Sequence, residues 1–316
     1  MAHSLAIEEF EALTRAFSGF GVDEKSIVTV LSKWHPEQRK SFRKSCPQFF
    51  KEDDRFFERW EDYHINILER EFARFKKATI LCTLHPSERD ARLAYEVIHK
   101  GQPSGILIEI ACTRSSEELL GARRAYHSLF NHSIEEDVAY HASGANRSLL
   151  VALVSSYRYE GTWVNAEIAR SEAKTLGKAI KEASKKKLIE NEDVVRILST
   201  RSKLQLKVTF DEYEEMFGEA IDKDLEDELS LQETVQCLSS PPKYFSKTLD
   251  MALKGGVSES TKEALTRVIV TRADIDMKEI KEEYQKVYGV PLAFKIEEAT
   301  CGNYRDFLLA LAGRSN

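Results

Sequence analysis

An all-α fold is predicted by three observations on this chain of 316 residues. A short phrase recurs four times, apolar residues stand at helical spacing around each copy, and the alternation typical of strands is nearly absent. Only seven prolines and fourteen glycines punctuate the chain, and 42% of the residues are hydrophobic, which is ample material for a core. Together these features indicate packed helices.

The recurring phrase marks the same point in four successive units. It reads Ile197-Leu198-Ser199-Thr200-Arg201-Ser202, and it returns at 268–273, at 110–115 and, in a weaker form, at 30–35. Counted from the arginine of the phrase, which is Trp34 in the first copy, apolar residues stand seven, four and three positions earlier. These residues are Ile27, Leu107, Val194 and Leu265, then Val30, Ile110, Ile197 and Val268, then Leu31, Ala111, Leu198 and Ile269. This spacing places three apolar side chains on one stripe of a helix.

A second helix follows the phrase in each unit. Twelve and sixteen residues after the origin stand mostly aromatic side chains: Cys46, Tyr126, Tyr213 and Tyr284, then Phe50, Phe130, Phe217 and Tyr288. The origins are 80, 87 and 71 residues apart, so each unit has room for about five short helices. We expect four units at 1–85, 86–159, 160–239 and 240–316, each burying its apolar face against its neighbours in one compact array.

Composition and charge narrow the function. The first 17 residues carry acidic side chains through their apolar positions, unlike a signal peptide, and the longest apolar runs fall far short of the ~20 residues of a membrane-spanning helix. We therefore expect a cytoplasmic protein. The net charge of −6 argues against binding nucleic acid and predicts repulsion from acidic lipid. A metal ion would have to bridge this chain to an anionic membrane.

Four units of this length resemble the annexin repeat over nearly the whole chain. The stretches Ala111-Cys112-Thr113-Arg114, Ser156-Tyr157-Arg158-Tyr159-Glu160-Gly161 and 197–202 are similar to plant annexins in particular. The resemblance implies a curved all-α array of four repeats. It also implies calcium-dependent, reversible and peripheral binding to acidic phospholipid membranes, with Ca²⁺ as the bound ion, movement from cytoplasm to membrane when calcium rises, and a role in calcium or stress signalling.

The loop after the first expected helix carries the sharpest chemical signal. Two glycines at alternate positions, Gly19 and Gly21, allow backbone conformations closed to other residues. The resemblance implies that the carbonyls of Phe17, Gly19 and Gly21 bind calcium. Calcium accepts six to eight oxygens, so such a site leaves positions open for water or a lipid phosphate oxygen.

Two carboxylates compete to complete this first site. The usual gap of the annexin family, counted from Val22, leads to Glu61, whereas the helical register that runs back from Pro86 leads to Glu71. We favour Glu71, because burial fixes the register of a helix, whereas the stretch 51–65 looks longer than in the family.

The remaining loops depart from the annexin pattern. In the second repeat the acidic position matches His141, and in the third repeat the loop 188–193 has no glycine pair, so we expect no strong calcium site in either. In the fourth repeat the usual acidic position matches Ala299. We expect at most a weak or adapted site there, built from carbonyls near Gly255 and the carboxylate of Glu298.

Other features suggest further roles. Cys112 and Cys237 match a pair proposed to be redox-sensitive in plant annexins. The histidine credited there with a peroxidase-like role matches Pro47, and the eight histidines show no spacing typical of a metal or haem site, so we interpret them as surface or packing residues. With no phosphate-binding glycine loop and no nucleophile paired with a base, we do not expect an enzyme.

Two interpretations of the function stay open. The first is calcium-dependent membrane binding, with self-association on the bilayer as a possible addition. The second is a helical-repeat scaffold whose calcium sites have largely degenerated and which binds protein partners. The stretch 195–197 resembles a segment suggested for actin binding, although a core helix with an outward arginine explains it better.

Overall fold

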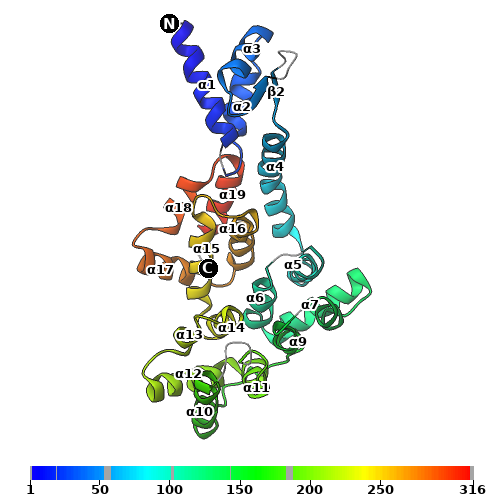
Figure 1. The fold of residues 1–316 in the computed structure, drawn as a ribbon, viewed down its shortest axis with the longest axis vertical. Coiled ribbons are helices and arrows are strands. Elements are labelled where there is room, and N and C mark those ends of the chain that lie inside the picture. Colours follow the sequence, from blue (N-terminus) through cyan, green and yellow to red (C-terminus); the bar gives the residue numbers. More distant parts are fainter. Residues whose placement is uncertain are drawn as a thin grey trace. The chain divides into compact units, whose positions relative to one another are not determined.

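The computed structural model describes residues 2–18, 20–52, 58–100, 103–142, 144–182 and 188–313. Within these ranges the chain forms nineteen helices and one short pair of strands (Figure 1). It divides into two compact units, Met1–Thr83 with Ser246–Asn316, and Leu84–Phe245. The first unit contains the first expected repeat and most of the fourth, and the second unit contains the two middle repeats. No helix in the described ranges is long and apolar enough to cross a membrane.

The discontinuous unit contains the two ends of the chain. We call it the outer unit because it is formed by the two outer parts of the sequence, and we call the unit formed by the middle of the sequence the inner unit. Its elements are α1 (Ala2–Ser18), α2 (Glu24–Leu31), α3 (Pro36–Ser45), β1 (Phe50–Glu52), β2 (Glu58–Trp60), α4 (Asp62–Thr83), α16 (Glu259–Arg272), α17 (Met277–Tyr288), α18 (Leu292–Ala299) and α19 (Gly302–Ala312). Helix α15 (Pro241–Leu253) begins just before the unit boundary.

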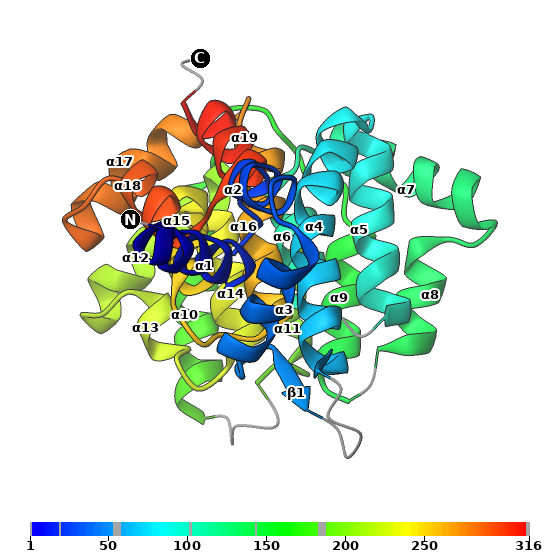
Figure 2. The same cartoon turned by 90° about the horizontal axis from the view of Figure 1, so that it is seen from above.

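The inner unit contains ten helices in the residues described. They are α5 (Pro86–Lys100), α6 (Gly105–Thr113), α7 (Ser116–Phe130), α8 (Ile134–His141), α9 (Asn146–Val154), α10 (Ala166–Glu182), α11 (Glu192–Thr200), α12 (Lys203–Phe217), α13 (Ile221–Asp224) and α14 (Leu229–Ser239). Helices α5 and α8 lie side by side at one edge of this unit (Figure 2).

The predicted apolar stripes form the core of each repeat. The recurring phrase ends a helix in all four copies, namely α2, α6, α11 and α16, and the residue four positions before its origin is buried each time. The residue twelve positions after the origin is also buried in every copy: Cys46, Tyr126, Tyr213 and Tyr284. The serine that ends the phrase then caps the next helix, because Ser115 and Ser202 accept hydrogen bonds from the N–H groups of Glu118 and Gln205.

In each copy, the residue at the origin of the phrase donates a hydrogen bond to a carboxylate. Arg114 makes two hydrogen bonds to Asp90 at 2.7 and 2.8 Å, and Arg201 and Arg272 pair with Glu172 and Asp276. In the first copy, the indole nitrogen of Trp34 donates to Glu9 at 2.7 Å. Like Arg114 and Arg201, the tryptophan therefore contacts a carboxylate on the preceding helix, although it cannot carry the charge.

A two-stranded ribbon departs from the purely helical expectation. Strands β1 and β2 pair antiparallel, with Phe50 opposite Trp60 and their ring centroids 4.5 Å apart. Trp60 also packs edge-on against Phe17, at 5.6 Å between centroids. The ribbon begins at Phe50, one residue before the stretch 51–65 that the sequence marks as longer than usual, and its second strand lies within that stretch. Because its aromatic residues join the core of the first repeat, the ribbon is part of that core.

Candidate functional site

The loop between α1 and α2 is fastened to the start of α19 within the outer unit. Phe20 forms a bridge with Thr300, and the N–H of Cys301 donates to the carbonyl of Phe20 at 3.2 Å. Gly21 adopts a left-handed conformation with φ of 95°, and a Cβ atom there would come within 2.8 Å of the Cys301 carbonyl. Only glycine fits this position without strain. The predicted need for glycine at 21 therefore has a structural reason.

Helix α4 brings Glu71 to this loop. The buried face of α4 contains Glu71, Arg74, Ala78 and Leu81, spaced as one stripe of a helix. The side chain of Glu71 is only 4% exposed, and its Oε2 accepts a hydrogen bond from the N–H of Gly21 at 2.7 Å. The structure therefore places the carboxylate that the helical register favours directly on the glycine loop.

Glu61 lies elsewhere in the outer unit. It is the residue between β2 and α4, its N–H donates to the carbonyl of Phe49 at 3.1 Å, and its carboxylate pairs with Lys51 on β1. His64 lies 3.3 Å away on the first turn of α4. These contacts give Glu61 a place at the base of the ribbon, whereas Glu71 has its place at the loop.

An arginine already holds the carboxylate at the loop. Arg74 contacts both oxygens of Glu71 at 2.5 and 2.7 Å, and its Nη2 also donates to Glu259 on α16 at 2.5 Å. Its guanidinium lies over the ring of Phe20, 4.5 Å from the centroid. Burial alone would raise the pKa of Glu259, but the hydrogen bonds and charges of Lys262 and Arg74 outweigh it and lower that pKa. Two carboxylates therefore share one guanidinium.

The donor set fits calcium on one condition. Phe17 lies in the last turn of α1, where carbonyls lack a partner within the helix, and Glu71 supplies a buried carboxylate beside Gly21. Gly19, the third predicted carbonyl donor, lies outside the described residues. The condition is that Glu71 exchanges its contacts with Arg74 for the metal, because both of its oxygens are now engaged by N–H donors.

Comparison with known proteins identifies the family. The Annexin family profile matches residues 89–153, 172–231 and 244–311. The chain belongs to the annexin family. It is 47% identical to annexin D4 of Arabidopsis thaliana over 315 residues, with 98% of both chains covered. It is 42% identical to annexin-like protein RJ4 of Fragaria ananassa over 320 residues, covering 98% of this chain and 96% of that one. The solved structure of annexin III matches with a TM-score of 0.69 and 26% identity, covering 98% of this chain and 94% of that one.

The profile match confirms the predicted family, and the match to a solved annexin structure confirms the predicted all-α fold class. Annexins bind Ca²⁺ and, as a family, bind phospholipid membranes in a calcium-dependent manner. They are generally membrane-binding proteins. The residues through which this annexin would bind calcium and lipid remain predictions.

The fourth repeat of this annexin gives less support to a site. Gly255 lies in the exposed loop between α15 and α16, followed by Gly256 with φ of 75°. Glu298 lies on α18 with its side chain 58% exposed, and it pairs with Lys295 one turn earlier at 2.7 Å. Among the described residues, no hydrogen bond joins Glu298 to Gly255. The predicted site in this repeat stays a prediction that the geometry does not strengthen.

The two cysteines of the suggested redox pair are deeply buried. Cys112 lies on α6 and Cys237 on α14, two helices that pack against each other in the inner unit, and both side chains are 0% exposed. Burial raises the pKa of the Cys112 thiol to about 11. Since the thiolate is the reactive form, a thiol that is protonated at neutral pH and shielded from solvent should respond slowly to oxidants.

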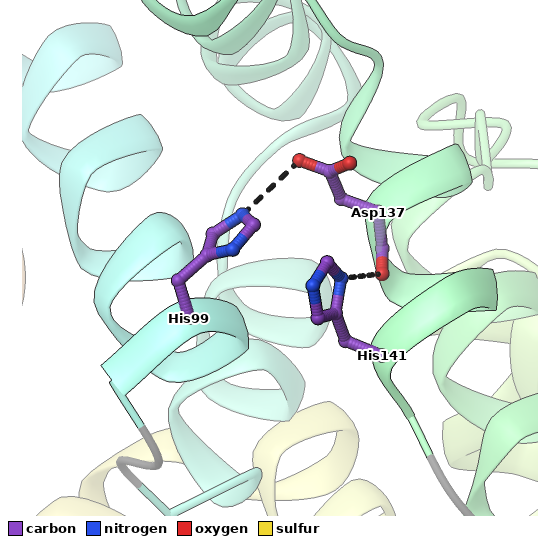
Figure 3. A group of neighbouring side chains, drawn as sticks. All are labelled: His99, Asp137 and His141. Carbon is purple, nitrogen blue, oxygen red and sulfur yellow. Dashed lines mark hydrogen bonds and ion pairs between the residues drawn. The ribbon is translucent and has the colours of Figure 1, made fainter.

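The structure also brings together three residues that the sequence interpretation left apart. One ligand atom each from His99, Asp137 and His141 lies within 4.8 Å of the others (Figure 3). Burial alone would raise the pKa of Asp137, but hydrogen bonds from Tyr126 and His99 and the charges of His132 and His99 outweigh it and lower that pKa. Two signals in the sequence point to this cluster: the spacing of Asp137 and His141 by four on one helix, and the histidine at the acidic position of the family pattern.

Proposed function

We propose that this annexin binds acidic phospholipid membranes peripherally and reversibly when calcium rises, chiefly through its first loop. The hydrogen bond between Gly21 and the buried carboxylate of Glu71 carries the proposal, because it puts a carboxylate beside the glycine loop. The carbonyls of Phe17, Gly19 and Gly21 would complete the protein ligands. When bound, Ca²⁺ supplies open coordination positions that lipid phosphate oxygens can fill.

The charge of the chain supports the need for a bound cation. At a net charge of −6 the protein is repelled by an anionic bilayer, so binding should vanish in chelator. A site with one carboxylate is weak by itself, and lipid that contacts only the occupied form strengthens it by linkage. This behaviour suits a cytoplasmic protein that moves to membranes in calcium or stress signalling.

Arg74 gives the proposed site an internal competitor. The guanidinium neutralises Glu71, yet it has a second carboxylate, Glu259, that it can keep when Glu71 turns to the metal. Lys262 holds that second carboxylate in place at 3.0 Å. We therefore expect the calcium affinity of the first loop to be set by the contest between Arg74 and the ion for one carboxylate.

Vesicle sedimentation tests the proposal. Phosphatidylserine vesicles are titrated with calcium in the presence of wild type, Glu71→Gln and Glu61→Gln, with a chelator sample for each. The double variant Glu71→Gln with Arg74→Gln keeps a neutral, hydrogen-bonding pair in the buried position, so it separates loss of binding from loss of folding. Circular dichroism confirms that each protein is folded.

The expected result is loss of calcium-dependent binding in both Glu71 variants and wild-type behaviour in Glu61→Gln. Loss in Glu61→Gln alone would mean that the spacing count identifies the ligand better than the helical register does. If Glu71→Gln binds like wild type, a remaining loop, first the one at Gly255 with Glu298, becomes the target. Equal binding in chelator and in calcium contradicts the proposal.

A scaffold role is the second candidate, and the ion pair between Arg74 and Glu71 favours it, since a neutralised carboxylate no longer attracts a cation strongly. Its sign would be a wild-type protein that fails to sediment with vesicles at any calcium concentration. Self-association on the bilayer remains a proposal. Actin binding through residues 195–197 gains little support, since Ile197 is fully buried and Arg196 pairs with Glu172 and Asp193.

A further inference from the structure

We propose that His99, Asp137 and His141 form a binding site for a transition-metal dication of the Zn²⁺ class in the second repeat. The three residues come from two neighbouring helices of the inner unit, His99 from the last turn of α5 and the other two from α8. Figure 3 shows both imidazole rings turned toward Asp137. This site is separate from the first loop and does not depend on calcium.

The spacing of the ligand atoms suits a small ion after a modest closure. The three atoms lie within 4.8 Å of one another, and the ring centroids of the two histidines are 4.5 Å apart. Metal bonds of about 2.0–2.1 Å at tetrahedral angles place ligand atoms about 3.3 Å apart. The largest inward movement is therefore about 1.5 Å, which rotation of the two histidine side chains can provide. His99 Nε2 lies 3.2 Å from Asp137 Oδ2, and the proton of this hydrogen bond leaves Nε2 when that nitrogen binds an ion.

A backbone hydrogen bond prepares His141 as a ligand. Its Nδ1 lies 3.0 Å from the main-chain carbonyl of Asp137. A carbonyl can only accept, so Nδ1 carries the proton in this contact, which leaves Nε2 as the nitrogen that can bind an ion. This is the usual arrangement of a metal-binding histidine, in which a hydrogen bond at one nitrogen orients the other toward the ion.

Packing does not account for the histidines. In the second repeat, Tyr126 donates to Asp137 at 2.7 Å, and the third repeat has the same pair, Tyr213 with Asp224, at the same distance. Counted from the arginine of the phrase, Glu228 takes the place of His141 in that repeat. The tyrosine–aspartate contact is thus made without a histidine at this position, and His141 adds chemistry that the shared packing does not need.

The donor set selects the kind of metal. Two imidazoles and one carboxylate suit Zn²⁺ and neighbouring transition-metal ions, whereas Ca²⁺ takes six to eight oxygens. The cluster lines a cavity of about 600 Å³ that gives an ion access from solvent. His132, at 3.7 Å from Asp137 Oδ1 and largely exposed, is within reach as a fourth ligand, and water can serve instead. A bound ion would join the end of α5 to α8.

The test uses Co²⁺ and Zn²⁺ on the full chain without a histidine tag. Co²⁺ absorption reports coordination geometry and shows whether a thiolate is bound, and Zn²⁺ affinity follows from competition with a chromophoric chelator. The variants are His99→Ala and His141→Ala, both at exposed positions, and His127→Ala on α7 as the matched control. All titrations are repeated with excess Ca²⁺.

Wild type and His127→Ala should bind one equivalent of Co²⁺ with a visible tetrahedral band and without a thiolate band, unaffected by Ca²⁺. His99→Ala and His141→Ala should each lose at least about tenfold in Zn²⁺ affinity, because even residues that only orient a metal ligand contribute about 10–100-fold. The proposal is overturned if these two variants bind like wild type, if a thiolate band shows that a cysteine holds the metal, or if wild type gives no band with equimolar Co²⁺.

Discussion

Arg74→Gln is the variant that most directly tests whether Arg74 and calcium compete for the carboxylate of Glu71. In chelator it leaves a carboxylate that is 4% exposed with the N–H of Gly21 but without its counter-charge. Removing one partner of a buried ion pair costs about 3–5 kcal/mol, so we expect the free energy of unfolding to fall by about that amount. Glu259 loses the same guanidinium, but it is partly exposed and keeps Lys262, so its share is small.

Calcium should reverse much of this loss. In wild type, calcium must displace Arg74 from Glu71 before it can bind the carboxylate, whereas in the variant it need not. If this displacement costs about 3 kcal/mol, its removal raises the calcium affinity about a hundredfold. Arg74→Gln should therefore need less calcium for half-saturation than wild type, although it is less stable without calcium. A purely structural role for Arg74 predicts the same loss of stability with and without calcium.

Urea unfolding in chelator and in saturating calcium measures both effects. A Trp163→Phe background leaves Trp34 and Trp60 as the fluorescent reporters, both in the outer unit that contains the site. Arg70→Gln is the control: Arg70 lies one turn earlier on α4, half exposed and 3.6 Å from Glu259, and a surface pair of this kind contributes about 0–1 kcal/mol. If Arg74→Gln behaves like Arg70→Gln in chelator, or if calcium stabilises both equally, the reasoning about Glu71 is wrong.

Three further outcomes follow from the same structure. Mass spectrometry should show that peroxide or a maleimide modifies the partly exposed Cys82 in the folded protein and leaves Cys112 unmodified. Rapid labelling of Cys112 would contradict its burial. The pKa of Glu259 is lowered from 4.5, so the ionised carboxylate stabilises the fold above that pH, and this stabilisation is lost as pH falls through the pKa of the folded state. In urea titrations the loss of stability caused by Glu259→Gln should therefore shrink from pH 7 towards acid, and a difference that stays constant with pH would refute this. Gly302→Ala should cost about 1–3 kcal/mol or more, because Gly302 has φ of 64° and a Cβ would collide with the Val22 carbonyl; unchanged thermal stability would contradict that contact.

The core could be predicted from sequence because it repeats. Positions fixed relative to the phrase share residue type in four copies, and such agreement identifies helix faces even where one copy has drifted. Trp34 shows the limit of this method, since an arginine replaced by tryptophan looks like decay. The structure shows that the indole donates to Glu9 and so keeps the tie between two helices of the first repeat. Sequence comparison by residue type does not show that one hydrogen-bond donor has replaced another.

The candidate calcium site was predictable only in part. Helical register selects Glu71, because burial along α4 leaves one rotational setting and that setting faces Gly21. The identity of its partner was hidden. Arg74 is one turn away on the same helix and could have been suspected, but the contact to Glu259 joins residues 185 positions apart and depends on how α4 and α16 pack within the outer unit.

The histidine cluster was missed for a similar reason. Sequence spacing shows that Asp137 and His141 share a face of α8, but it does not show that His99, 38 residues before Asp137, ends the helix beside them. A metal motif read from sequence needs its ligands close together in the chain, whereas this one is assembled by the contact between α5 and α8.

One position explains why the repeats differ in chemistry while sharing a core. Counted from the origin of each phrase, the same place is Glu61, His141, Glu228 and Ala299. In the first repeat the ribbon β1–β2 lies before this place, and Glu71, ten residues later, faces the loop instead, while Glu61 pairs with Lys51 at the base of the ribbon. The stretch that contains the ribbon therefore places a different carboxylate at the loop, while the buried stripe of α4 keeps its helical register. The ligands of each repeat can change at its loop ends while the helices keep their packing.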